Sequence, residues 1–256
     1  MRSTLAKVVL LATLPGWSGY CLGAGSPQSD NINMEAMTVA ELEKAGDQAR
    51  MEKDYNLAID YFQAALRKDR RNAVLQNKVG LSQLRKNDLD VARSSFEKAV
   101  RFNSKYPEAV NNIGAVDYMK KNYASAAKYF KKAIALNEAY APYHINLGAA
   151  WFSQKKMERA IAEYTRAMEL DPDAFRHESN FGITAQIASP EERAHYSYLL
   201  AKIYAQRGDP EHCLQCLKRA KEDGYRNLTN LYKDEAFSQM WQNSQLHEIV
   251  PPPTAK

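Results

Sequence analysis

Residues 120–137, KKNYASAAKYFKKAIALN, contain the pattern that decides the fold. Ala126, Phe130 and Ala133 stand at positions i, i+4 and i+7, so they share one face of a helix. The same small–large–small trio recurs one and two periods of 34 residues earlier, and one period later. The other copies are Ala58, Phe62 and Ala65; Ala92, Phe96 and Ala99; and Ala160, Tyr164 and Ala167. Four copies in one register indicate an internal repeat rather than a single amphipathic helix.

A glycine precedes each trio by twelve positions, at Gly46, Gly80, Gly114 and Gly148. Polar pairs lie between glycine and trio: Lys53-Asp54, Asn87-Asp88, Lys121-Asn122 and Lys155-Lys156. Each copy therefore predicts two antiparallel helices joined by a short turn, with the glycine where the helices approach closely. We expect Gly114 to meet Ala126 at this crossing, and Phe130 to fill the gap towards the next repeat.

This pattern resembles the tetratricopeptide repeat, which runs W-x-x-L-G-x-x-Y, then A-x-x-x-F, then Pro. The fourth copy matches best, with Leu147-Gly148, Trp151 in the tyrosine place, Ala160, Tyr164 and Pro172. The earlier copies depart from the family at the final proline, where they have Arg70, Ser104 and Glu138. The resemblance covers residues 39–174 without a gap. It implies an all-α solenoid of helical hairpins, wound as a right-handed superhelix, whose first helices line a concave surface.

A fifth, degenerate copy has Ala201 in the glycine place, 53 residues after Gly148, which implies an insertion of 19 residues. Thr38 and Glu41 predict a capping box at the start of the array, and Ser189 with Pro190 predicts a helix start within the insertion. The predicted segments are a signal peptide (1–25), a linker (26–37), four repeats (39–72, 73–106, 107–140 and 141–174), the insertion (175–193), the fifth repeat (194–227), a C-terminal capping helix (228–250) and a disordered tail (251–256).

The N-terminus has the residue order of a secretory signal peptide. Arg2 and Lys7 accompany an apolar run at residues 8–14, far shorter than the roughly 20 residues that span a membrane. Removal of residues 1–25 leaves 33 basic and 30 acidic residues, a net charge of about +3 that predicts no nucleic-acid partner. We expect a bacterial exported protein, periplasmic or secreted, without a membrane span after cleavage. An uncleaved membrane anchor is the alternative.

Beyond the signal peptide, the cysteines are Cys213 and Cys216, within HCLQC. No βαβ pattern surrounds them, His212 stands on the wrong side for haem attachment, and a zinc site needs two more ligands. Cys213 takes the place of the first alanine of each trio, which indicates a small buried residue. A thiol-dependent redox protein remains the alternative. Because the chain has no G-x-S-x-G, H-E-x-x-H or phosphate-binding glycine loop, we predict no enzyme, cofactor or metal site.

The first helices have a second face, opposite their packing residues, where a ligand-binding groove is predicted. Its apolar residues in the second to fourth repeats are Leu81, Leu84, Tyr118, Met119, Ile145 and Phe152. Apolar bands exposed in this way usually mark binding. We expect Asn77 and Asn111 to hydrogen-bond a ligand's backbone and Arg85 to meet a carboxylate. The alternative is that the aromatic residues support neighbouring helices.

These features predict a non-enzymatic protein–protein interaction scaffold of the cell envelope that binds a peptide or helix of a partner. Some similar proteins clamp chaperone tails with Lys and Asn, but Glu43 and Asp47 stand in those places here. The expected ligand is therefore an apolar or amphipathic segment rather than an acidic C-terminus. A membrane-tethered envelope assembly factor is the alternative function.

Overall fold

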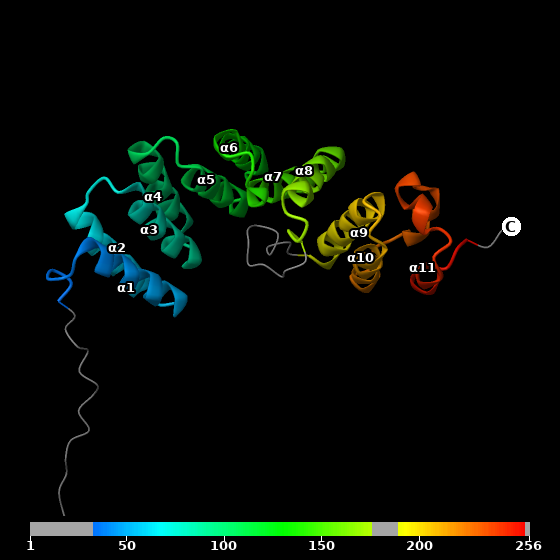
Figure 1. The fold of residues 1–256 in the computed structure, drawn as a ribbon, viewed down its shortest axis with the longest axis horizontal. Coiled ribbons are helices and arrows are strands. Elements are labelled where there is room, and N and C mark those ends of the chain that lie inside the picture. Colours follow the sequence, from blue (N-terminus) through cyan, green and yellow to red (C-terminus); the bar gives the residue numbers. More distant parts are fainter. Residues whose placement is uncertain (1–32, 176–188, 254–256) are drawn as a thin grey trace, which may run out of the picture. The chain divides into compact units, whose positions relative to one another are not determined.

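The computed structural model describes residues 33–175 and 189–253, and within these ranges all regular structure is helical (Figure 1). The predicted signal peptide, the start of the linker (26–32), residues 176–188 of the insertion and the end of the tail (254–256) lie outside the described residues. The prediction of an all-α solenoid of helical hairpins is confirmed, because each helix packs against the next one along the chain.

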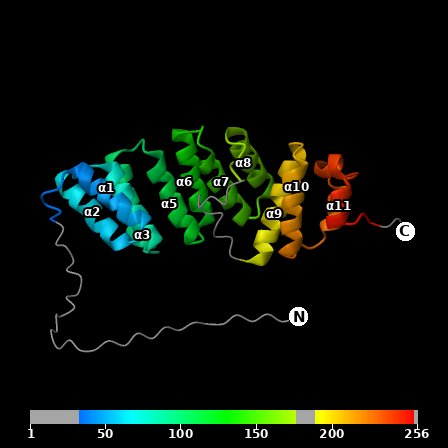
Figure 2. The same ribbon diagram turned by 60° about the horizontal axis from the view of Figure 1, so that its bottom comes forward.

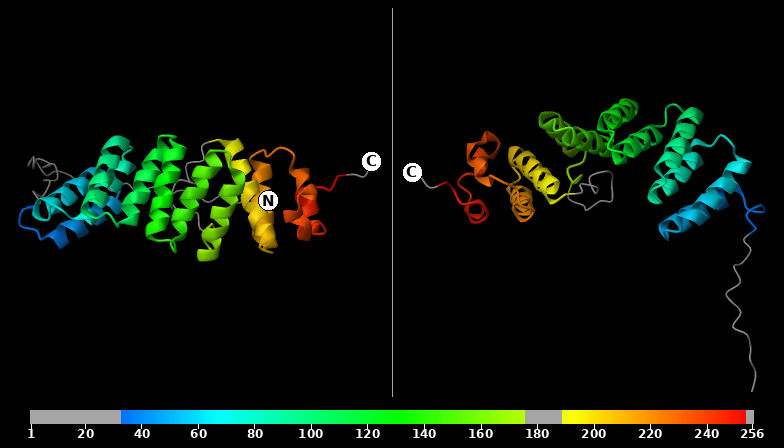
Figure 3. Two further views of the ribbon diagram at one scale, coloured as in Figure 1. Left: turned by 90° about the horizontal axis from the view of Figure 1, so that it is seen from above. Right: turned by 180° about the vertical axis from the view of Figure 1, so that it is seen from behind.

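Four helix pairs of nearly equal length occupy residues 39–170. They are α1 (Val39–Met51) with α2 (Tyr55–Lys68), α3 (Ala73–Arg85) with α4 (Leu89–Phe102), α5 (Pro107–Met119) with α6 (Tyr123–Leu136), and α7 (Ala141–Ser153) with α8 (Met157–Leu170). Figures 2 and 3 show the two helices of each pair side by side. We refer to the earlier helix of a pair as the first helix and to the later one as the second.

The turn within each pair is built on one residue in the left-handed conformation. Lys53, Asn87, Lys121 and Lys155 have φ between 61° and 66°, and Gly208 has φ 68° at the equivalent place of the fifth pair. A side chain with a Cβ atom is disfavoured there by about 1–2 kcal/mol. The four non-glycine turns therefore keep a strained residue at the same register position.

Each repeat glycine makes room for the aromatic ring of its own hairpin. A Cβ atom added to Gly114 would lie 2.6 Å from Cε1 of Phe130 and 3.2 Å from the backbone oxygen of Ala126. Gly46, Gly80 and Gly148 have the same relation to Phe62, Phe96 and Tyr164. The expected contact with Ala126 is therefore secondary, and the ring of Phe130 is the group that a larger residue would strike first.

The array begins with a complete capping box. The Thr38 hydroxyl accepts a hydrogen bond from the Glu41 backbone at 3.3 Å, and the Glu41 carboxylate accepts one from the Thr38 backbone at 2.8 Å. Met34 and Met37, at the end of the predicted linker, pack against the core of the first pair. The last residues before α1 are thus part of the folded unit.

The fifth pair consists of α9 (Pro190–Gln206) and α10 (Pro210–Glu222). Ser189 caps α9 by accepting a hydrogen bond from the Glu192 backbone at 3.1 Å, as predicted. With 17 residues, α9 is longer than the first helices of the four regular pairs, which have 13. Tyr196 in its first half packs edge-on against both Phe152 and Tyr164, with ring centroids 6.0 and 5.6 Å apart. Tyr196 of α9 therefore covers part of the fourth repeat.

The C-terminal cap differs from the single helix that was predicted. It consists of two 3₁₀ helices, η2 (Leu228–Lys233) and η3 (Glu235–Met240), and the short helix α11 (Ser244–Ile249). Asp234 and Asn243 interrupt it, because each has extended backbone angles and accepts a hydrogen bond at the start of the next element. The cap nevertheless buries an apolar face, with Leu231, Phe237, Met240, Leu246 and Val250 in the core.

Candidate functional site

The predicted groove residues divide into an accessible group and a buried group. We call the surface of α3 and α5 that bears Val74, Leu81, Leu84, Arg85 and Met119 the first-helix face. Val74 is 44% exposed, Arg85 is exposed, and Leu81, Leu84 and Met119 are half-buried. Neither Val74 nor Met119 belongs to a hydrophobic core cluster, and the exposed part of each side chain is available to a partner.

Tyr118, Ile145 and Phe152 are buried, with 7%, 6% and 4% of their surface exposed. The Tyr118 hydroxyl hydrogen-bonds with the Ser153 hydroxyl at 2.9 Å, and burial raises the pKa of this tyrosine. Phe152 meets Tyr196 of α9. The expectation of an exposed apolar band therefore fails at these three residues, since contacts between repeats cover them.

Asn77 and Asn111 are engaged in a ladder between neighbouring first helices. The amide of Asn112 donates to Asn77 at 2.9 Å, and that of Asn146 donates to Asn111 at 2.9 Å. Asn77 also donates to the Tyr106 hydroxyl at 3.4 Å. The acceptor oxygens expected to read a ligand's backbone already bond within the chain. The recurrence of Asn at a spacing of 35 residues was the sequence signal for this ladder.

An ion pair occupies the equivalent place between α1 and α3. Lys78 contacts Glu43 at 2.7 Å and Asp47 at 2.5 Å. Arg50 also meets Asp47, at 3.3 Å. The two carboxylates are thus neutralised by cations of the chain itself, and this end of the array is unsuited to an incoming acidic group.

The two cysteines lie on the buried side of α10. Cys213 is 0% exposed and Cys216 is 8% exposed, and both are free thiols. Burial raises the pKa of Cys213 to about 12 and that of Cys216 to about 11. A nucleophilic cysteine needs a lowered pKa, so this environment favours a packing role.

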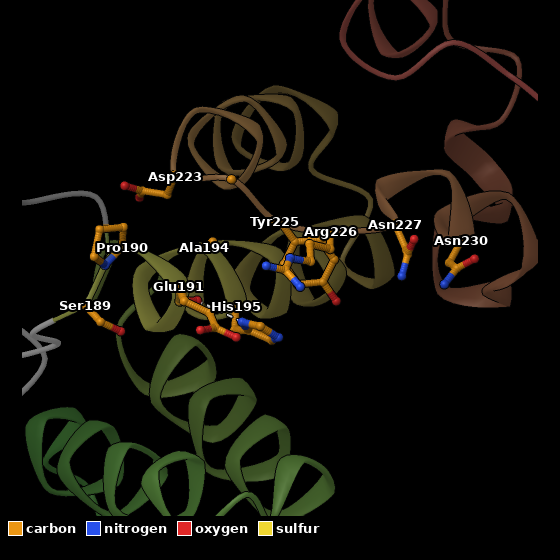
Figure 4. Close-up of a pocket in the computed structure, with 11 residues that line it drawn as sticks. Ser189, Pro190, Glu191, Ala194, His195, Asp223, Tyr225, Arg226, Asn227 and Asn230 are labelled. Atoms are coloured by element: carbon orange, nitrogen blue, oxygen red, sulfur yellow. Dashed lines mark hydrogen bonds between the residues drawn. The ribbon is translucent and has the colours of Figure 1, made fainter.

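A polar pocket of about 640 Å³ lies between the start of α9 and the segment after α10 (Figure 4). Ser189, Glu191 and His195 line one side, and the segment 223–227 lines the other. The ring of Tyr225, which lines the pocket, stacks on Tyr198 with ring centroids 4.3 Å apart. No sequence pattern pointed to a pocket at these residues. The charged residues that line the pocket are not buried, so we assign no ligand to it.

Residues 33–175 and 189–253 hold no cluster of three His, Cys, Asp or Glu side chains placed to bind a metal ion. None of the helices in these ranges combines the length and the apolar character that a membrane span requires.

The hairpins, their register and their shared first-helix surface define a helical-repeat protein of the kind that binds other proteins. The sequence model of the tetratricopeptide repeat matches residues 44–107 and 116–175. The chain is a tetratricopeptide repeat protein, a class whose members serve as protein–protein interaction scaffolds.

Solved structures support the same fold. The MamA protein is 22% identical, with a TM-score of 0.50 over 72% of this chain and 91% of its own. MamA 41-end from Desulfovibrio magneticus RS-1 is 17% identical, with a TM-score of 0.51 over 72% and 93%. TTC0263, a thermophilic tetratricopeptide repeat protein of Thermus thermophilus, is 18% identical, with a TM-score of 0.51 over 79% and 99%. Among curated proteins, none matches this chain.

Proposed function

We propose that this protein is a non-enzymatic scaffold that binds an amphipathic helix of a partner protein on the first-helix face. The observation that carries the proposal is the exposed apolar surface of Val74, with half-buried Leu81 and Leu84 on the same helix and half-buried Met119 on α5. Side chains of this kind supply anchor sites for the apolar face of a helix. Arg85 lies at the edge of this surface and can pair with an acidic residue of the partner.

The proposed contacts are narrower than the nine residues chosen from the sequence. The partner surface consists of Val74, Leu81, Leu84, Arg85, Asn111 and Met119. The other four of the nine residues are buried and support the partner surface from within the array; they are Asn77, Tyr118, Ile145 and Phe152.

The Asn ladder favours a helical partner over an extended one. An extended peptide presents unpaired backbone N–H and C=O groups, which lose water on binding and need new hydrogen bonds. Asn77 and Asn111 already accept hydrogen bonds from the next repeat. A helix satisfies its own backbone and needs only apolar contacts from the surface. Circular dichroism of the isolated partner segment, free and bound, tests this point: a bound segment without added helical signal contradicts it.

The main experiment replaces Val74 and Met119, whose apolar side chains are partly exposed, with glutamate. The double change Val74→Glu and Met119→Glu should abolish the recovery of partners from a cell-envelope extract by the immobilised full-length chain. The control is Val91→Glu with Leu136→Glu, at side chains 54% and 37% exposed on the second helices of the same two repeats. Both variants should keep the circular dichroism spectrum of the wild type.

The two outcomes are distinct. Retention of the same partners by the folded Val74/Met119 variant, in the amounts that the control retains, overturns the assignment of this face. Equal loss in both variants also overturns it, because the effect would then follow from added charge in general.

The envelope location is a proposal from the N-terminal sequence. Arg2, Lys7 and the apolar residues 8–14 support export from a bacterial cytoplasm, to the periplasm or the medium. N-terminal sequencing of the protein from fractionated cells tests it. An intact Met1 in the membrane fraction favours the tethered assembly factor, and an intact Met1 in the cytoplasm contradicts export.

A further inference from the structure

Three cations surround the ring of Trp151, near the end of α7. Nζ of Lys131 lies 5.0 Å from the ring centroid, Nζ of Lys156 lies 4.8 Å from it, and Cζ of Arg159 lies 5.2 Å from it. Lys131 comes from α6, whereas Lys156 and Arg159 come from the start of α8. The three cations are exposed, while Trp151 is only 8% exposed. Contact with the ring orients these otherwise flexible side chains. We call this group the Trp151 cation cluster.

The Trp151 cation cluster has no acidic partner within the described ranges, whereas several other cations of the array have one. The paired cations include Lys78 with Glu43 and Asp47, Lys120 with Asp90, Arg166 with Glu138 and Glu169, and Lys202 with Asp234. Lys156 donates to the side-chain oxygen of Gln154 at 2.8 Å, a neutral acceptor. The charge of the cluster is therefore not neutralised within the described fold.

The preceding repeat has a carboxylate at the place that Trp151 occupies in the fourth repeat. Asp117 stands 34 residues before Trp151, at the same register place. It is 3% exposed and pairs with Arg93 of α4, and it accepts a hydrogen bond from Ser125 at 2.6 Å. In the third repeat, this place thus supplies a carboxylate to a cation of the previous second helix. The fourth repeat has an indole there instead, so this place supplies no carboxylate to the cations around it.

The surrounding sequence is strongly basic as well. Residues 120–166 contain nine Lys and Arg against three Asp and Glu, a net charge of +6, whereas the whole chain has +5. Two of the three acids are engaged, since Glu163 meets His144 at 2.8 Å and Glu138 meets Arg166 at 3.6 Å. A surface with this potential attracts anionic partners.

We propose that the Trp151 cation cluster binds an acidic segment of a partner protein, with its carboxylates paired to Lys131, Lys156 and Arg159. The burial of Trp151 favours a protein over the other anionic macromolecules. Single-stranded nucleic acids need an exposed aromatic face for base stacking, and membrane surfaces favour protruding aromatic side chains. The three cations lie on α6 and at the start of α8, whereas the first-helix face lies on α3 and α5, so the two surfaces consist of different residues.

The test uses fluorescence anisotropy of labelled hexaglutamate added to the full-length chain at low ionic strength. Exchange of the three cations for alanine (Lys131→Ala, Lys156→Ala and Arg159→Ala) should weaken binding by at least about tenfold, because the anchoring charges are lost. The matched control is Arg67→Ala with Lys98→Ala and Lys218→Ala, which removes the same charge from exposed side chains of three other second helices. The control should change the affinity by less than about threefold, as expected for dispersed surface charges.

Three results overturn the proposal. The first is failure of the wild type to bind hexaglutamate, and the second is equal weakening in the cluster variant and the control. The third is stronger binding to anionic phosphatidylglycerol vesicles or to oligothymidylate than to hexaglutamate, with loss in the cluster variant. The Val74→Glu, Met119→Glu variant should bind hexaglutamate normally, so failure of this proposal and failure of the first-helix face are distinguishable.

Discussion

Gly114→Ala tests the packing that sets the spacing of the two helices in a hairpin. The added Cβ would approach Cε1 of Phe130 to 2.6 Å and Cδ1 to 2.8 Å, where ordinary contact begins at 3.4 Å. The ring of Phe130 is 0% exposed and has no free space to enter without moving its neighbours. The change therefore overpacks the core, at a cost of about 1–3 kcal/mol.

Helix propensity acts in the opposite direction and allows a net estimate. Alanine is favoured over glycine within a helix by up to about 1 kcal/mol. The expected net loss for Gly114→Ala is thus about 0.5–2 kcal/mol, with a larger loss for Gly114→Leu. At about 2–4 °C per kcal/mol for a protein of this size, the alanine variant should melt roughly 1–8 °C below the wild type.

The assay is thermal and urea unfolding followed by circular dichroism, for Gly114→Ala alone and combined with Phe130→Leu. Leucine removes the ring atoms that the new Cβ would strike, so the effect of Gly114→Ala should shrink by about 1 kcal/mol or change sign in that background. If Gly114→Ala instead stabilises the protein equally in both backgrounds, helix propensity alone is at work and the proposed clash does not exist.

The other predictions concern a turn, a thiol and a histidine. Lys121→Gly should stabilise the fold by up to about 1 kcal/mol in urea unfolding, because glycine tolerates the left-handed conformation that costs lysine energy; a loss would show that the turn is unstrained. Cys213→Ala should change stability by less than about 1.5 kcal/mol, since alanine fits this place in the other repeats. Its thiol, with its pKa raised to about 12, should stay unreactive towards thiol reagents until the protein unfolds. The hydrogen bond with Glu163 raises the pKa of His144 in the folded state. This pair should therefore stabilise the fold fully below the unfolded histidine's pKa of about 6.5. The stabilisation should be lost as pH rises through the pKa of the folded state. Glu163→Gln should accordingly cost more free energy of unfolding near pH 5.5 than near pH 8, and an equal cost at both pH values contradicts this.

The repeat architecture was predictable because its determinants are local. A glycine and its aromatic partner, such as Gly114 and Phe130, lie 16 residues apart within one hairpin, and the spacing recurs four times. Capping is local too: Thr38 with Glu41 and Ser189 with Glu192 form within four residues. Such interactions are readable from the sequence, since they depend on short spacings along one or two helices.

The burial of Phe152 on α7 was not predictable in the same way. Phe152 is covered by Tyr196, and the residues between them include an insertion that breaks the 34-residue register. No periodicity indicates which part of α9 returns to cover the fourth repeat. The amphipathic pattern of α7 alone predicted an exposed face, but 11 of the 13 residues of this helix are buried. Long-range packing overrides helical periodicity here.

The position three residues after the repeat glycine differs in chemistry from one repeat to the next. Three residues after the glycine, Gln83 accepts a hydrogen bond from Ser95 at 2.7 Å, Asp117 pairs with Arg93, and Trp151 meets three cations. The glycines and trios that define the hairpin are nearly invariant between repeats, so they report the fold and leave this place free to differ. An amide, a carboxylate and an indole are all compatible with the same backbone, and Trp151 in addition packs within the apolar core. The residue at this place also decides whether the cations beside it are neutralised within the chain. Asp117 neutralises Arg93, whereas we propose that the cations around Trp151 are available to a partner.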